Sequence, residues 1–162
     1  IRKVRGHQAV RMNGHLYTGW NSRLDEIQAV AIRARHARFA AEQADRDQVA
    51  AIYDSYIPEA NRLQLLNGGR GMKVTYHQYW LRVKNRAGLQ KLLDENGVDT
   101  AIYYDPPMHK HVLAEYCRVS GELVEAERAG RDVLILPIHA ALPFEDAHRV
   151  GKLVGDFLAT DG

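Results

Sequence analysis

Hydrophobic positions recur with a helical period over the first third of the chain. They fall in two runs, at Leu24, Ile27, Ala31, Ala34, Val49, Ile52, Tyr53 and Tyr56. Charged residues fill the positions between them, which is typical of an amphipathic helix. Ser22 can accept a hydrogen bond from a free backbone amide at a helix start, and Pro58 cannot continue a helix. The pattern predicts one long helix, or two nearly collinear helices, between Ser22 and Pro58.

Three later stretches have the composition of β-strands. Met72–Val83, MKVTYHQYWLRV, is rich in aromatic and branched residues with rough period-two alternation. Val98–Tyr104 is the second candidate, which Pro106 and Pro107 would stop, and VLILP at Val133–Pro137 is the third. These stretches predict a sheet of about three strands.

Helical patterns separate the strand candidates. They are a short helix around Leu89–Leu93 closed by Asn96 and Gly97, two pieces around Val112–Cys117 and Glu122–Ala129, and a last helix over Phe144–Leu158. The order is long helix, strand, helix, strand, helices, strand, helix. It predicts an α+β domain in which a small sheet is covered by helices.

Composition and charge exclude several classes of protein. The 162 residues are 46% hydrophobic and 26% charged, with 22 basic residues against 20 acidic ones, which predicts a globular domain without a nucleic-acid surface. Cys117 is the only cysteine, so no internal disulfide can form and a reducing compartment is favoured. No apolar run reaches the roughly 18 residues of a membrane span. We therefore expect a cytoplasmic protein that binds neither nucleic acid nor membrane.

The eight histidines do not have the spacing of metal ligands. His109 and His111 are two positions apart and would point to opposite sides of an extended segment. Neither a His-Glu-x-x-His sequence nor a pair of cysteines occurs. We therefore predict no metal site.

One stretch gathers several chemically active side chains. VDTAIYYDPPMH, Val98–His109, ends a predicted strand with two tyrosines, an aspartate, two prolines and a histidine. Stiff loops of this kind on rigid scaffolds often bind ligands. Tyrosines at the end of a strand also commonly pack with the hydroxyl in water. From the residues alone, the structural interpretation is favoured over a binding loop.

Three stretches share their order and spacing with one enzyme family: GWNSRLDEIQA at Gly19–Ala29, the run Asn96–His109, and LILPIHAAL at Leu134–Leu142. They resemble the pyridoxal phosphate (PLP) dependent aminotransferases of the DegT and StrS type. The first is similar to that family's glycine, aromatic, asparagine, any residue, arginine run before a helix with Gln-Ala. Together the three stretches cover about the whole chain.

The resemblance implies a division of the chain. Residues 1–22 would end the large PLP-binding domain with a loop that reaches the cofactor, and residues 23–162 would form the small C-terminal domain with its long linking helix. In the family, the lysine attached to PLP lies in the large domain, which precedes these segments. No lysine here has a similar context, and Lys3 is interpreted as a surface residue. We therefore expect no catalytic residue in this chain and no activity from this part alone.

The resemblance also implies a cofactor contact. In family dimers, the asparagine of the first motif helps to hold the PLP phosphate of the neighbouring subunit, and Asn21 matches it. Arg23 would support the same site by charge or by bracing the loop. We therefore expect a homodimer whose sites are shared across the interface. Without the resemblance, Asn21 is interpreted as a turn residue and Arg23 as part of a surface or interface ion pair.

Five further residues would by the same resemblance lie near the mouth of the substrate site: His77, Tyr103, Tyr104, His109 and His139. Tyr103 stands where the family usually has histidine, which bears on how a sugar or phosphate is held. The final motif departs too, with Ala140 where proline is common.

The implied activity is transfer of an amino group from a donor, glutamate or glutamine, to a keto sugar that we expect to be linked to a nucleotide. Two alternatives stay open. One is a free-standing small domain that acts by binding or dimerisation without catalysis. The other is a PLP-dependent sugar dehydratase of the same family, in which histidine replaces the lysine. The residues do not separate a sugar ketone from a cyclitol ketone.

Overall fold

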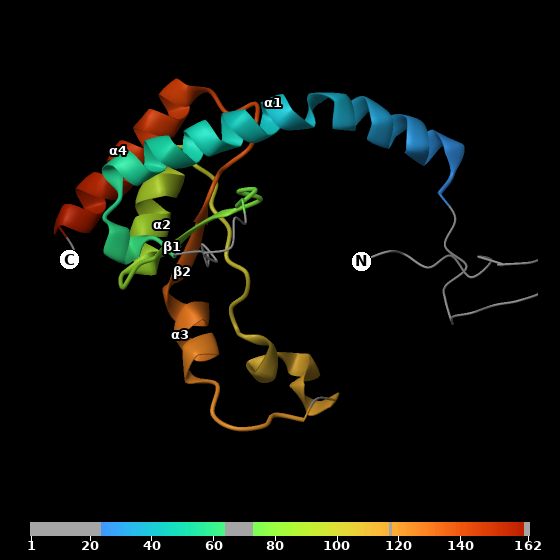
Figure 1. The fold of residues 1–162 in the computed structure, drawn as a ribbon. Coiled ribbons are helices and arrows are strands. Elements are labelled where there is room, and N and C mark those ends of the chain that lie inside the picture. The colour runs from blue at the N-terminus through green and yellow to red at the C-terminus, as the bar shows by residue number, and fades with distance from the viewer. Residues whose placement is uncertain (1–23, 64–72, 117, 161–162) are drawn as a thin grey trace, which may run out of the picture. The chain divides into compact units, whose positions relative to one another are not determined.

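The computed structural model describes residues 24–63, 73–116 and 118–160. Its main elements (Figure 1) are, in order, helix α1 (Glu26–Tyr56), strand β1 (Tyr79–Arg82), helices α2 (Arg86–Glu95) and α3 (Val124–Asp132), strand β2 (Val133–Leu136) and helix α4 (Phe144–Thr160). Short 3-10 helices lie at Glu59–Asn61, Met108–Lys110 and Val112–Tyr116. The predicted helix start at Ser22 and the predicted cofactor contacts of Asn21 and Arg23 lie outside the described residues.

The chain divides into two compact units, Ile1–Ala40 and Ala41–Gly162. Of the two possibilities that the hydrophobic spacing left open, the structure has the single helix, because α1 is continuous over 31 residues. It ends at Tyr56, just before Pro58, as predicted. Side chains from its second half enter the core of the second unit, whereas nearly all those of its first half are exposed.

β1 and β2 form an antiparallel pair in which Tyr79 lies opposite Leu136. β2 is buried along its whole length, while β1 alternates buried and half-buried residues, in agreement with their hydrophobic patterns. β1 is shorter than the predicted strand 72–83. Tyr76 has a positive φ of 43°, in the left-handed region that an extended strand does not use, so pairing begins only after it.

About three strands were expected, and the described residues contain two. The third candidate, residues 98–104, pairs with β2 only at Ala101, whose amide and carbonyl exchange hydrogen bonds with Ile135 at 3.2 and 2.9 Å. The chain then continues to Pro106 and Pro107, which have no amide hydrogen to donate to a ladder. The α+β class is confirmed, while the expected third strand is reduced to one bridge.

The helices near the sheet agree with the sequence patterns. Asn85 caps α2 by accepting a hydrogen bond from the Gly88 amide at 3.0 Å. Gly97 follows this helix with a φ of 69°, a left-handed conformation that glycine adopts easily. The first of the two predicted helical pieces is a 3-10 helix, and the second corresponds to α3.

The core of the second unit lies between the sheet and the helices α1, α2 and α4 (Figure 1). Its fully buried side chains include Tyr53, Leu81, Leu89, Leu93, Leu134 and Val154. The Tyr53 hydroxyl donates to the Pro137 carbonyl at 2.7 Å and so ties α1 to the end of β2. A Cβ on Gly155 would lie 2.7 Å from the Tyr56 carbonyl oxygen, so α4 approaches the end of α1 closely. Within the described ranges, no helix has the length and apolar character needed to cross a membrane.

Candidate functional site

His77 and His139 lie at one end of the sheet. His77 precedes β1 by two residues and His139 follows β2 by three. Because Tyr79 and Leu136 face each other in the antiparallel pair, the two histidines belong to the same end. Both side chains are exposed.

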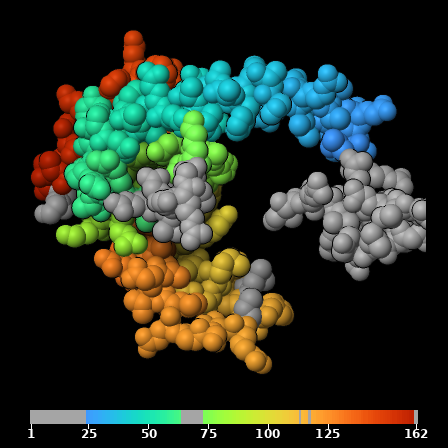
Figure 2. All heavy atoms as spheres, in the orientation of Figure 1, coloured from blue at the N-terminus to red at the C-terminus, as the bar shows by residue number. Residues whose placement is uncertain are grey.

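Tyr103, Tyr104 and His109 follow the chain toward the other end of the sheet. The bridge at Ala101 is antiparallel, so the chain after it runs toward the start of β2 and α3. The gold and orange atoms of this region gather at one end of the unit in Figure 2. The two ends of β2 are roughly 10 Å apart at about 3.3 Å per residue. The structure therefore brings the two tyrosines and His109 to one region and places the other two histidines apart from them.

The two tyrosines form an exposed aromatic pair. Their ring centroids are 5.1 Å apart and the ring planes are inclined by 39°. Tyr103 is 44% exposed and Tyr104 is 66% exposed. Aromatic faces at a surface can stack on a nucleobase or on the apolar face of a sugar ring. The pair is therefore a candidate contact for such a ligand.

Arg86, the first residue of α2, holds the loop that carries the aromatic pair. Its side chain is only 15% exposed, and its Nη2 forms an ion pair with Asp105 Oδ2 at 2.5 Å. Its Nη1 donates to the carbonyl oxygen of Gly130, in the last turn of α3. A Cβ on Gly130 would come within 3.1 Å of Pro107 Cδ, so α3 and the loop are in close contact. No local sequence pattern marks Arg86, because its partners come from two distant segments.

Glu127 joins His109 and Lys110 through its two carboxylate oxygens. Oε1 lies 3.1 Å from His109 Nε2, and Oε2 lies 2.8 Å from Lys110 Nζ. Hydrogen bonds from Lys110 and then from His109 hold the pKa of Glu127 below its usual range. Glu127 is therefore an anion at neutral pH and can only accept hydrogen bonds. Sequence reasoning missed Glu127, which stands 18 residues after His109.

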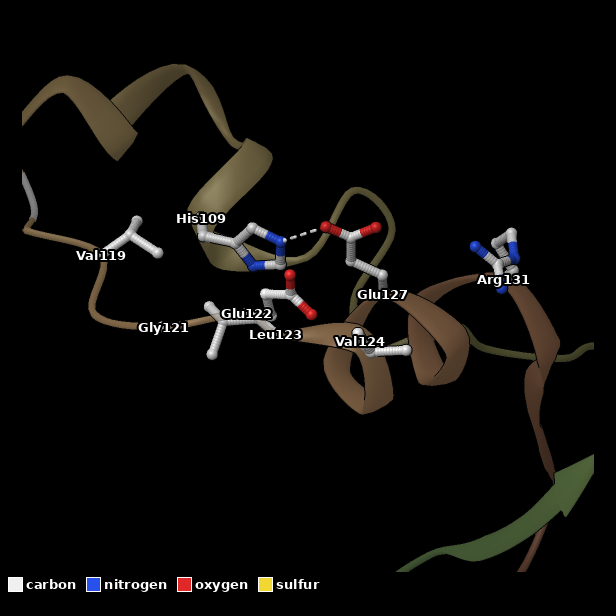
Figure 3. Close-up of a pocket in the computed structure, with 8 residues that line it drawn as sticks. All are labelled: His109, Val119, Gly121, Glu122, Leu123, Val124, Glu127 and Arg131. Atoms are coloured by element: carbon white, nitrogen blue, oxygen red, sulfur yellow. Dashed lines mark hydrogen bonds and ion pairs between the residues drawn. The ribbon is translucent and has the colours of Figure 1, made fainter.

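His109 also lines a pocket of about 320 Å³ beside the start of α3. In Figure 3 the Nε2 edge of its ring faces Glu127, and the other ring nitrogen is turned away from that carboxylate. The remaining wall contains Val119, Gly121, Glu122, Leu123, Val124 and Arg131. Half of the lining residues have polar side chains, so the pocket can offer hydrogen bonds to a small polar ligand.

The described lysines do not suit the covalent attachment of an aldehyde cofactor such as PLP. A lysine that forms an imine needs a neutral amine, which desolvation or a cationic neighbour provides. The described lysines are all exposed: Lys73, Lys84, Lys91, Lys110 and Lys152. Two of them, Lys73 and Lys110, pair with carboxylates at 2.8 Å. The described part of the chain also contains no cluster of His, Cys, Asp or Glu suited to a metal ion.

Fold and site together define an α+β unit with an exposed aromatic pair, a pocket lined by His109, and exposed lysines. The chain belongs to the DegT/DnrJ/EryC1/StrS aminotransferase family, whose sequence model matches residues 2–155. The resemblance carried by the three sequence motifs is thereby confirmed.

The relatives that the chain matches are longer proteins. A pleiotropic regulatory protein of Geobacillus stearothermophilus is 31% identical over 96% of this chain and 43% of the relative. A dTDP-3-amino-3,4,6-trideoxy-alpha-D-glucose transaminase of Streptomyces venezuelae is 32% identical over 93% of this chain and 40% of the relative. The crystal structure of S. venezuelae DesV in complex with a ketimine intermediate aligns at 31% identity and a TM-score of 0.76, over 96% of this chain and 42% of that one. The chain thus spans about two fifths of the length of these proteins.

Proposed function

We propose that this chain is the C-terminal part of a PLP-dependent aminotransferase that moves an amino group from glutamate or glutamine to a keto sugar linked to a nucleotide. The observation that carries the proposal is the alignment with DesV, which covers 96% of this chain at a TM-score of 0.76. The S. venezuelae transaminase is named for a dTDP-linked amino sugar, which supports the class of substrate.

In this proposal, residues 1–22 end the large PLP-binding domain and residues 23–162 form the small domain with its linking helix. Asn21 and Arg23 contact the phosphate of PLP in the other subunit of a homodimer. An amide side chain and free backbone amides close to a helix start suit a phosphate, and α1 begins at Glu26. PLP, when bound, supplies the electron sink for the transfer, and the large domain supplies the lysine that moves the proton.

The described residues bind and orient the substrate. Tyr103 and Tyr104 offer aromatic faces to a base or sugar ring, and His109 offers a ring nitrogen to a hydroxyl group. His77 and His139 contact another part of the same ligand, at the opposite end of the sheet. A nucleotide-linked sugar is long enough to reach both ends.

Reduction with borohydride tests the presence of the cofactor in the native protein. The protein is purified from its native gene, reduced, and its intact mass is measured under denaturing conditions. We expect a species of more than twice 18.3 kDa, the mass of the 162 residues, with one pyridoxyl group on a lysine. A single species of 18.3 kDa without the added group would contradict the proposal.

One feature of α1 favours a second candidate, a small domain that acts by binding or dimerisation without catalysis. Four apolar side chains of its first half are between 50% and 84% exposed: Ile27, Val30, Ile32 and Phe39. Exposed apolar stretches favour association with another protein surface. Sedimentation equilibrium of the 162-residue chain and of its Ile27→Ser variant tests this candidate. It requires a self-associating wild type that the substitution weakens, and a monomeric wild type would remove it.

A further inference from the structure

The contact between Glu127 and His109 decides which nitrogen of the histidine can accept a hydrogen bond. A neutral imidazole has one donor nitrogen and one acceptor nitrogen. Oε1 of Glu127 carries no proton and lies 3.1 Å from Nε2 of His109. Nε2 must therefore donate, which leaves Nδ1 as the acceptor. In Figure 3 this second nitrogen is turned away from Glu127.

Lys110 decides which carboxylate oxygen of Glu127 contacts His109. Its ammonium group occupies Oε2 of Glu127 at 2.8 Å, so Oε1 is left for His109. His109 and Lys110 both stand on the 3-10 helix Met108–Lys110, whereas Glu127 stands on α3. The two contacts together fix the rotation of the carboxylate. The His109 side chain is only 13% exposed, so its ring has little freedom to turn.

We propose that Glu127 is a positioning residue that holds His109 in the tautomer protonated at Nε2, so that Nδ1 accepts a hydrogen bond from a ligand hydroxyl in the pocket. The other lining residues fit an uncharged ring that carries hydroxyl groups. Glu122 is a second acceptor, Arg131 is a donor, and Leu123 covers an apolar face. One part of this proposal rests on the proposed function, namely that the ligand is the sugar of the substrate.

The tautomer of His109 can be read from the imidazole nitrogen shifts in long-range proton–nitrogen NMR spectra, recorded where histidines are neutral and assigned with a His109→Gln variant. We expect the form protonated at Nε2 in the wild type. In Glu127→Gln, Lys110 should retain the side-chain oxygen and turn the amide NH2 toward Nε2, which must then accept. The form protonated at Nδ1 should become the major one, because the carboxylate that selects the tautomer is gone.

Glu125→Gln is the matched control. It makes the same change of charge on α3, at an exposed side chain whose ion pairs are with Arg82 and Arg128 at 3.9 and 3.8 Å. We expect it to leave the tautomer of His109 unchanged. The proposal would be overturned if His109 is protonated at Nδ1 in the wild type, or if the Glu127→Gln variant keeps the wild-type tautomer of His109.

Titration with dTDP-glucose, with dTDP alone as the matched probe, tests the contact with a hydroxyl group. We expect dTDP-glucose but not dTDP to shift the Nδ1 signal of His109. Binding should be about 5- to 10-fold weaker in Glu127→Gln, as for the loss of one hydrogen bond. An unmoved Nδ1 signal, or an equal response to dTDP, would overturn recognition of the hydroxyl. Neither NMR readout requires amino transfer, so a failure of the proposed function is distinguishable from a failure here.

Discussion

Arg86 and Asp105 form an ion pair with an Nη2 to Oδ2 distance of 2.5 Å, which ties the start of α2 to the loop that carries Tyr103 and Tyr104. The same guanidinium donates to the carbonyl of Gly130 at the end of α3. One mostly buried side chain therefore joins two helices and the loop. The aromatic pair is thus positioned by the packing of the whole unit and not by the loop alone.

Replacing Arg86 by methionine should lower the free energy of unfolding by about 1–3 kcal/mol, because the Gly130 carbonyl loses its donor and Asp105 its partner. Urea unfolding followed by circular dichroism measures this change. Lys91→Met is the control, since the ion pair of Lys91 with Glu95 is exposed on both sides, at 77% and 60%. The control should change stability by less than about 0.5 kcal/mol. Equal losses of unfolding free energy in the two variants would contradict a stabilising role of the Arg86 contacts.

Tyr53→Phe should destabilise the protein by about 1 kcal/mol, because the Pro137 carbonyl loses a hydrogen bond donor within the core. Tyr104→Phe is the matched control. Tyr104 is 66% exposed, so water can take the place of its hydroxyl group when that group is removed. Urea unfolding at neutral pH compares the two variants. A loss in the control as large as that in Tyr53→Phe would contradict the role given to the buried hydroxyl.

At alkaline pH, the burial of Tyr53 should make the stability of the protein depend on pH. Burial, and then the nearby charge of Asp146, raise the pKa of Tyr53 well above the ordinary value of 10.0. The raised pKa in the folded state favours the neutral phenol. The stabilising contribution of Tyr53 is therefore complete below its ordinary pKa and is lost as the pH rises above that pKa. The wild type should therefore lose more stability than Tyr53→Phe above that pH. Parallel stability curves would contradict this.

Gly155→Ala should destabilise the protein although alanine favours helices. The added Cβ would lie 2.7 Å from the backbone carbonyl oxygen of Tyr56, which cannot move aside without shifting α1. Such overpacking costs about 1–3 kcal/mol, more than the roughly 1 kcal/mol that alanine contributes to a helix relative to glycine. Thermal unfolding measures the net effect. A higher melting temperature in the variant would contradict the close approach of α4 to α1.

The loss of stability in acid should depend on Glu127 and Asp47. Hydrogen bonds from Lys110 and from Lys73, respectively, are the main causes that lower the pKa values of these carboxyl groups in the folded state. Depressed values stabilise the protein above the ordinary values of 4.5 and 3.8, and this contribution is lost as the pH falls through the folded-state values. The stability of a Glu127→Gln/Asp47→Asn double variant should thus fall less steeply in acid. Urea midpoints that fall with decreasing pH as steeply as those of the wild type would contradict this.

Much of the fold follows from local signals. Proline after α1, the Asn-Gly pair after α2 and the apolar run of β2 each mark an element where the structure has it. The positive φ of Tyr76 has no such local signal. The extent of pairing at Ala101 depends on Ile135, a residue distant in the chain. This is why β1 is shorter than expected and the third strand is missing from the described residues.

The candidate site was less accessible to sequence reasoning than the fold. His109 and the two tyrosines were singled out by the motif that they share, and the structure brings them to one region. Arg86 and Glu127 were missed because their partners are 19 and 18 residues away in the chain. Only the antiparallel register of the strands shows that His77 and His139 lie at the other end of the sheet.

Transfer of nitrogen is the most direct measure of the proposed activity. The protein purified from its native gene is incubated with PLP, ¹⁵N-labelled glutamate or glutamine, and a dTDP-linked 3-keto hexose, and the sugar is analysed by mass spectrometry. We expect a dTDP-linked amino sugar that carries the label, and a much smaller yield from an Asn21→Ala variant. A keto sugar recovered unlabelled, or one that has lost water without gaining nitrogen, would contradict an aminotransferase.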